Sequence, residues 1–183
     1  MQRATPKSNR GPAAAAENRA ALLAAARRLF VERGYHVPLS AIAREAGVGQ
    51  GSLYRHFPDR DTLGTAILDE NLADLEATDR DFSAIWRAVV GQLVESGAFV
   101  EAALGRAAPE QGAIREQRFR ALVSGPLARA REAGQVAADV TDDALLLVMR
   151  MVLGAVHTEP DVPSRRATAT RVLALIGRGL ELG

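Results

Sequence analysis

The amino-acid sequence predicts an all-α fold of about nine helices, with a small N-terminal head and a larger C-terminal body. Apolar residues recur at three- and four-residue spacing along almost the whole chain, and no segment shows a sustained alternation of β-branched residues. The 183 residues are 48% hydrophobic, which is enough to bury a sizeable core. We therefore expect helices that pack on helices, and no sheet.

The composition excludes several kinds of site. Cysteine is absent, which excludes disulfides and thiolate-bound metals, and the three histidines, His36, His56 and His157, are too scattered to indicate a zinc cluster. The N-terminus has no apolar signal region, and no later stretch approaches the roughly 20 apolar residues of a membrane span. We expect a soluble cytoplasmic protein without a cofactor, a metal ion or a membrane partner.

Charge is divided unevenly between the two ends of the chain. The formal net charge is +1, but residues 1–60 contain ten basic and four acidic side chains, whereas residues 61–183 contain 13 basic and 18 acidic ones. Neutralisation of phosphates by Lys and Arg supplies much of the affinity of proteins for DNA. A basic head on an acidic body therefore indicates a protein that meets a polyanion at one end.

Residues 1–12 are predicted to form a flexible basic arm. Their Pro, Ser, Asn and Gly content resists packing, and their three basic side chains suit either a minor groove or a solvated tail. The first helix is predicted over about 13–33, with leucine, alanine and phenylalanine on one face. Gly34 follows it and can adopt the left-handed conformation of a C-cap.

Two short helices follow and complete a predicted head at residues 13–58. The first begins near Pro38, whose missing N–H would be unpaired at a first helical position anyway, and it ends before Gly47. The second covers about residues 50–57 and is stopped by Pro58.

The body is predicted to occupy residues 59–183. Its helices are expected over about 59–78, 82–104, 110–132, 141–158 and 164–181. Proline and glycine separate them, and the interval 105–112 has room for one further short helix.

Residues 39–57 have the spacing of a helix-turn-helix. Ile42 and Ala43 point inward on the first short helix, and Gly47 permits a positive φ in the turn. Val48 and Leu53 fill the corner between the two helices. The second short helix is left with a polar and basic outer face made of Gln50, Ser52, Tyr54, Arg55 and His56. Such a face suits the major groove of DNA.

On these residues the chain resembles the TetR family, the tetracycline-repressor-like one-component regulators. The family pattern has an aromatic residue and Gly at the end of the first helix, then Ile-Ala, Ala-Gly-Val, a small residue, Leu-Tyr-x-His-Phe and a basic residue at the next helix. It is met by Phe30, Gly34, Tyr35, Ile42, Ala43, Ala46, Gly47, Val48, Gly51, Leu53, Tyr54, His56, Phe57 and Arg60. The resemblance is strong over residues 17–68, and beyond them only length and helix count agree.

The resemblance implies contacts with DNA for particular residues. Tyr54 and His56 are expected to contact backbone phosphates, although the tyrosine ring could also fill the helix corner. Gln50 and Ser52 are expected to face base edges, and Arg44 to reach a base or a phosphate. The full expected set is Ser40, Arg44, Gln50, Gly51, Ser52, Tyr54, Arg55, His56 and Arg60.

The body is expected to hold a small hydrophobic or aromatic ligand. Trp86 lies among other aromatic and methionine side chains that suit an apolar cavity, although ordinary core packing explains the same pattern. Arg118 or Arg120 could hold an anionic group of the ligand, or could lie on the exposed surface. The expected lining residues are Leu63, Ile67, Trp86, Val89, Leu93, Phe99, Phe119, Leu122, Met149 and Val152.

The last two helices have apolar faces wider than one small core requires. In the resembled family two such helices pair with their copies in a partner as a four-helix bundle, which would cover the patch. A homodimer also fits DNA, because two recognition helices must reach major grooves about 34–36 Å apart. The expected interface residues are Leu145, Val148, Val152, Val156, Val172, Leu175, Ile176 and Leu180.

These features predict a bacterial, nucleoid-associated repressor that a small molecule releases from double-stranded operator DNA by tilting the helix after the head. The pattern Gly47-x-Gly49-x-Gly51 follows a helix rather than a strand, and no orienting acid accompanies His56, so no enzyme is indicated. Four alternatives remain. They are a ligand-independent regulator, an activator, a helical enzyme or small-molecule-binding protein with a non-functional DNA head, and a structural helical dimer.

Overall fold

The computed structural model describes residues 11–77, 80–106 and 109–177, with the side chains of all of these except 97–106 and 109. Within these ranges the chain forms helices and no strand, so the predicted all-α class is confirmed. The helices are α1 (Gly11–Arg33), α2 (Leu39–Glu45), α3 (Gln50–His56), α4 (Arg60–Glu76), α5 (Phe82–Arg106), α6 (Pro109–Glu132), α7 (Asp142–Val156) and α8 (Val162–Gly177). None of these described helices has the length and apolar character that crossing a bilayer requires.

Most helix bounds lie close to the predicted ones. α1 begins at Gly11, ahead of the predicted start, because the ring of Pro12 is tolerated in a first helical turn, where its missing N–H has no acceptor to serve. In the interval 105–112 the described residues belong to α5 and α6, and they form no separate short helix. The expected arm at residues 1–10 and the end of the last predicted helix at 178–183 lie outside the described residues.

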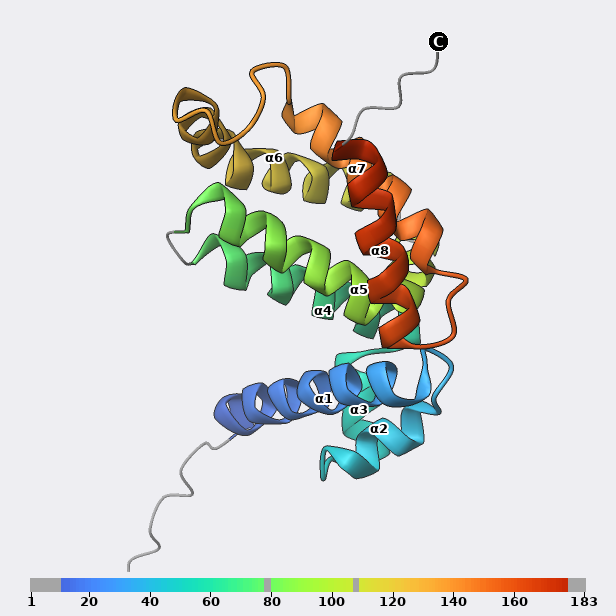
Figure 1. Ribbon diagram of the computed structural model, residues 1–183. Coiled ribbons are helices and arrows are strands. Elements are labelled where there is room, and N and C mark those ends of the chain that lie inside the picture. Colours follow the sequence, from blue (N-terminus) through green and yellow to red (C-terminus); the bar gives the residue numbers. More distant parts are fainter. Residues whose placement is uncertain (1–10, 78–79, 107–108, 178–183) are drawn as a thin grey trace, which may run out of the picture.

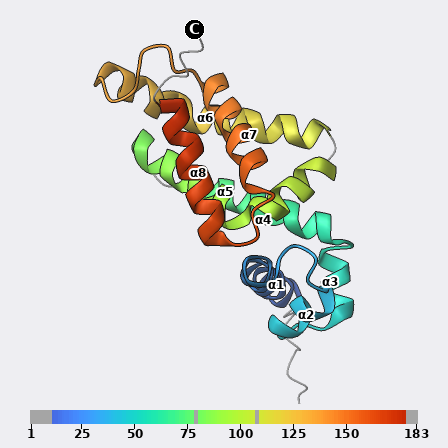
Figure 2. The ribbon, with the colours of Figure 1, turned by 45° about the vertical axis from the view of Figure 1, so that its right-hand side comes forward.

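The chain is arranged as a head of α1, α2 and α3 and a body of α5 to α8 (Figure 1). Figure 2 shows the same two groups, with α4 passing from the head into the body, where it packs along α5. The head has one apolar cluster, to which α1, α2, α3 and the first half of α4 contribute. In the body one cluster lies among α4, α5, α6 and α7, and another lies among α5, α7 and α8.

The ends of the helices carry the capping residues that the sequence provides. Gly34 ends α1 with a φ of 79°, and its N–H donates to the carbonyl of Phe30 at 3.0 Å, as predicted for a left-handed C-cap. Asp59 precedes α4 and accepts a hydrogen bond of 2.7 Å from the N–H of Thr62. That bond holds the pKa of Asp59 below its ordinary value. α4 therefore starts from a defined position next to the head.

Candidate DNA interface and ligand cavity

The corner between α2 and α3 is filled by small and apolar side chains. Ile42, Ala43 and Leu53 are all buried in the cluster of the head. Gly47 has a φ of 66°, which glycine adopts without strain, and the next N–H, of Val48, donates to the carbonyl of Ala43 at 2.9 Å. The predicted turn is thus formed, and it leaves the outer side of α3 in solvent.

α3 presents a polar surface to solvent. Its six expected contact residues are exposed or half-buried, namely Gln50, Gly51, Ser52, Tyr54, Arg55 and His56. Tyr54 is 51% exposed, so its ring does not fill the corner, which Leu53 occupies. On α2, Ser40 and Arg44 are exposed as well.

The basic side chains of this surface are free of acidic partners in the described part of the chain. No carboxylate there lies within ion-pair distance of Arg44, Arg55 or His56. Behind them, Arg28 on α1 is paired with Glu45 at 2.9 Å. Positive charge that no neighbouring acid neutralises favours contact with phosphates.

Arg60, the remaining expected contact residue, binds backbone carbonyls of the head. Its Nη1 donates to the backbone carbonyls of Tyr35 and Val37, the latter at 2.7 Å, and its guanidinium lies 5.4 Å from the centroid of the Tyr35 ring. The side chain therefore fixes the loop between α1 and α2. Nη1 of Arg60 is thus engaged inside the head, and the expected DNA contact of Arg60 stays a prediction.

Ion pairs that the sequence did not reveal join α1 to α4. Glu70 accepts from Arg19 at 2.8 Å and from Arg27 at 3.1 Å, and Asn71 accepts from the same nitrogen of Arg27 at 3.1 Å. Arg19 also lies over the ring of Phe57, 5.6 Å from its centroid. Arg19 therefore contacts both Phe57, which directly follows α3, and Glu70 in α4.

A cavity of about 380 Å³ lies among α4, α5, α6 and α7. Four of the residues expected to line a pocket do line it, namely Val89, Leu93, Phe119 and Met149. The other lining residues are Leu68, Asn71, Leu72, Leu75, Gln92, Ser96, Gly112, Arg115, Glu116, Leu146, Arg150 and Leu153. This volume is in the range of sites for small molecules.

The remaining expected lining residues lie in other places. Leu63 and Ile67 are fully buried in the cluster of the head, and Val152 is fully buried in the cluster that α5, α7 and α8 share. Trp86 and Leu122 pack, half-buried, against the cluster of α4 to α7. Phe99 is part of α5, but its side chain is outside the described residues.

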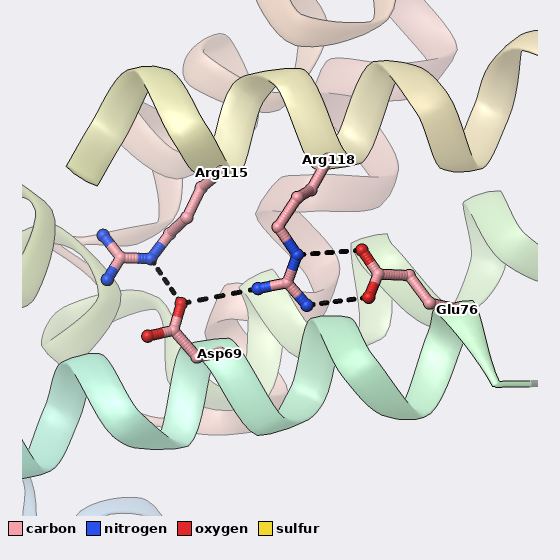
Figure 3. A network of polar contacts seen from close by, with 4 residues as sticks. All are labelled: Asp69, Glu76, Arg115 and Arg118. Atoms are coloured by element: carbon pink, nitrogen blue, oxygen red, sulfur yellow. Dashed lines mark hydrogen bonds and ion pairs between the residues drawn. The ribbon is translucent and has the colours of Figure 1, made fainter. Parts of the chain in front are cut away.

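A polar network at one side of the cavity links α6 to α4 (Figure 3). Arg118 binds both carboxylate oxygens of Glu76, at 2.9 and 2.7 Å, and this pairing lowers the pKa of Glu76. Arg115 donates from Nε to Asp69 at 2.9 Å. The sequence indicated Arg118 and missed Arg115. Arg115 and Arg118 are three residues apart, which places both on one face of a helix, and this spacing was the signal in the sequence that could have identified Arg115.

Arg120, the other expected anchor for a ligand, forms ion pairs with two acids of α7. Its Nη1 binds Asp142 at 3.2 Å and Asp143 at 2.5 Å, in the first turn of α7. These two acids raise its pKa further. Arg120 therefore fixes α6 to the start of α7.

The expected dimer residues divide between the core and the surface. Leu145, Val152 and Val156 are buried inside one chain, which removes them from any surface that a partner could touch. Leu175 is 55% exposed, Val148, Val172 and Ile176 are half-buried, and Leu180 lies outside the described residues. The exposed apolar residues of α7 are Leu147 and Met151, at 57% and 46%.

Two family models match the chain. The model described as bacterial regulatory proteins, tetR family, matches residues 22–67, which contain the helix-turn-helix. The model described as transcriptional regulator SbtR-like, C-terminal domain, matches residues 62–182. The two matches meet inside α4.

A curated relative matches over the head, and solved structures match over most of the chain. An HTH-type transcriptional regulator of Staphylococcus aureus strain USA300 is 39% identical over 59 residues, which are 32% of this chain and 32% of that protein. The TetR transcription regulatory protein from Mycobacterium vanbaalenii is 30% identical, with a TM-score of 0.54 over 78% of this chain and 96% of that one. The TetR transcriptional regulator SCO0520 from Streptomyces coelicolor is 28% identical, with a TM-score of 0.57 over 88% and 97%.

Proposed function

Because the chain belongs to the TetR family of bacterial transcriptional regulators, as its sequence resemblance predicts, we propose that it is a homodimeric repressor which a small molecule releases from its operator. Proteins of this family bind operator DNA through their helix-turn-helix and form dimers. For this chain we propose four things: the residues that contact DNA, the dimer surface, the sign of regulation and the ligand-induced release.

In the proposed complex α3 enters the major groove. Gln50 and Ser52 read base edges, while Tyr54, Arg55 and His56 bind phosphates from the same helix. The observation that supports this arrangement is the exposed face of α3, whose cations have no acidic partner among the described residues. Arg44 lies at the end of α2 and adds a further cation.

The dimer surface is proposed on the outer sides of α7 and α8. Leu147 and Met151 are one helical turn apart on α7, and Leu175 is exposed on α8. Apolar side chains that solvent reaches on two adjacent helices form a patch that a second copy of the chain can cover.

Release is proposed to act through α4, because this helix is shared by the head and the cavity. Leu63 and Ile67 are completely buried in the head, whereas Leu68, Leu72 and Leu75 line the cavity. A ligand that displaces the second half of α4 therefore changes the position of the head. Coupling of about 1–3 kcal/mol between the two sites is typical of allosteric proteins and lowers operator occupancy several-fold.

The test of DNA binding compares two equivalent glutamine variants. Gln50→Ala should weaken binding to the promoter of the protein's own gene by about 1–3 kcal/mol in a gel-shift titration, because one base contact is lost. Gln111→Ala removes an exposed glutamine from α6 and should leave affinity unchanged. Equal affinity of both variants and the wild type would contradict the assignment of α3, and a reporter that loses expression on deletion of the gene would contradict repression.

The test of the dimer surface uses two exposed apolar residues. Leu175→Asp should shift the protein to monomers in analytical ultracentrifugation, because a dimer would bury an unpaired charge. Ile114→Asp changes a residue of similar exposure on α6, 57% against 55%, and should leave the dimer intact. A dimer that survives Leu175→Asp would place the interface elsewhere.

A further inference from the structure

Arg115 has a guanidinium group whose hydrogen bonding is incomplete. Its side chain is 13% exposed, and its Nε donates to Asp69 at 2.9 Å. Its Nη1 is buried and meets no hydrogen-bond acceptor among the described residues. In Figure 3 both terminal nitrogens of Arg115 point away from Asp69. Buried N–H groups are nearly always paired, so this nitrogen indicates an acceptor that a ligand supplies.

The other polar groups of the cavity wall offer little to a cation. Glu116 is the one acid among the described lining residues, and its carboxylate already accepts a hydrogen bond from Arg150. Asn71 accepts from Arg27 through Oδ1, which leaves its NH₂ group as the donor. Among the lining side chains, Arg115, Arg150 and the amide of Asn71 offer donors, and Gln92 and Ser96 can both donate and accept.

The remainder of the wall is apolar. It is made of Leu68, Leu72, Leu75, Val89, Leu93, Phe119, Leu146, Met149 and Leu153, with Gly112. A molecule that fills the 380 Å³ must bury aliphatic or aromatic surface against these side chains and also supply an acceptor to Arg115.

We propose that the cavity binds the anion of an apolar carboxylic acid, with the carboxylate on Arg115 and the aliphatic or aromatic part against the leucines. This inference rests on the proposed effector role of the cavity and names the chemical class of the effector. Guanidinium and carboxylate form charge-assisted hydrogen bonds that are about twice as strong as neutral ones, which favours an acid over an alcohol. An amine would place a second cation beside Arg115.

The test uses three ligands that share a ten-carbon chain and differ in the head group, namely decanoate, decan-1-ol and decylamine. In isothermal titration calorimetry with the full chain, decanoate should bind at least about tenfold more tightly than the other two. 1-Naphthoate, compared with 1-naphthylmethanol, repeats the comparison with an aromatic body. Failure of both acids to bind at millimolar concentration overturns the proposal.

Matched arginine variants locate the binding group. Arg115→Met should weaken decanoate binding at least about tenfold and leave decan-1-ol within about twofold of wild type, since only the charged contact is removed. Arg118→Met removes the neighbouring guanidinium, which binds Glu76, lies 3.8 Å from Asp69 and does not line the cavity, and it should leave decanoate binding within about twofold of wild type. Arg115→Lys should retain part of the affinity, and unchanged circular dichroism and operator binding without ligand report that each variant is folded. Equal loss of acid and alcohol binding in Arg115→Met overturns the role of Arg115.

A separate measurement distinguishes this inference from the proposed function. If decanoate binds through Arg115 but leaves operator affinity unchanged, the ligand class stands and the proposed release fails. If a neutral compound releases the operator while neither acid binds, the proposed release stands and the ligand class is overturned.

Discussion

In the head, one apolar cluster closes around α1, α2 and α3 and leaves the polar contact residues outside, whereas in the body the apolar clusters leave a cavity into which Arg115 is directed. Both regions are built from apolar helices. The polar residues of the head lie outside its apolar cluster, whereas Arg115 of the body lies at the wall of an internal cavity. A surface site can be inferred from side chains that the core does not need. An internal site cannot be inferred in this way, because the same leucines and phenylalanines can fill a core or line a cavity.

The largest expected difference concerns truncation of apolar side chains. Phe57 is 2% exposed in the filled head, so Phe57→Ala should lower the free energy of unfolding by about 3–5 kcal/mol through lost contacts and a new cavity. Leu72 is half-buried and borders a cavity that already exists, so Leu72→Ala should cost only about 1 kcal/mol. Urea denaturation at one fixed protein concentration measures both, and equal losses would show that the body is packed as tightly as the head.

The fold of the head and the exposure of its polar residues could be predicted because their signals are local. Ala43, Gly47 and Leu53 have fixed positions within one turn and two short helices, and the alternation between buried and exposed residues follows from helical geometry. Arg60 shows the limit of this reasoning. Its spacing places a cation next to α3, but the carbonyls of Tyr35 and Val37 that bind it are distant in sequence.

The body was predicted less completely because its helices are apolar on more than one side. Leu63 and Ile67 of α4 are buried in the cluster of the head, whereas Leu68 both packs against that cluster and lines the cavity. On α7, Val152 is buried and Met151 beside it is exposed. Both residues are apolar, so the sequence alone does not distinguish them. Which face of such a helix meets the core, a cavity or a partner depends on where α5, α6 and α8 lie in space.

The ion pairs between α1 and α4 allow the two regions to be tested where they join. Arg27→Met removes bonds to Glu70 and Asn71 that cross from the head to α4, and it should lower the free energy of unfolding by about 1 kcal/mol. Arg28→Met removes a more exposed pair with Glu45 inside the head, and its effect should be smaller than about 0.5 kcal/mol. Thermal unfolding of both variants gives the comparison. No loss of stability in Arg27→Met would mean that the junction does not depend on the bonds of Arg27.

The response of Glu76 to acid is also expected to be small. Two acids of α4 and its cap have lowered pKa values for different reasons: in Asp59 the backbone N–H of Thr62 is the main cause, whereas in Glu76 it is the side chain of Arg118 on α6. Because the pKa of folded Glu76 lies below its ordinary 4.5, its contribution to stability is present above that value and is lost as the pH falls through the folded pKa. Glu76→Gln should therefore lower the free energy of unfolding at neutral pH by about 0.5 kcal/mol, a small value because the pair is partly exposed. Between about pH 5 and pH 3 the variant should lose less stability than the wild type does. Glu17→Gln, which changes an exposed acid of α1 outside its first turn, serves as the control in urea titrations at each pH. An unchanged pH dependence in Glu76→Gln would mean that the pairing of α4 with α6 contributes no measurable stability, and the cavity wall would then depend on apolar packing alone.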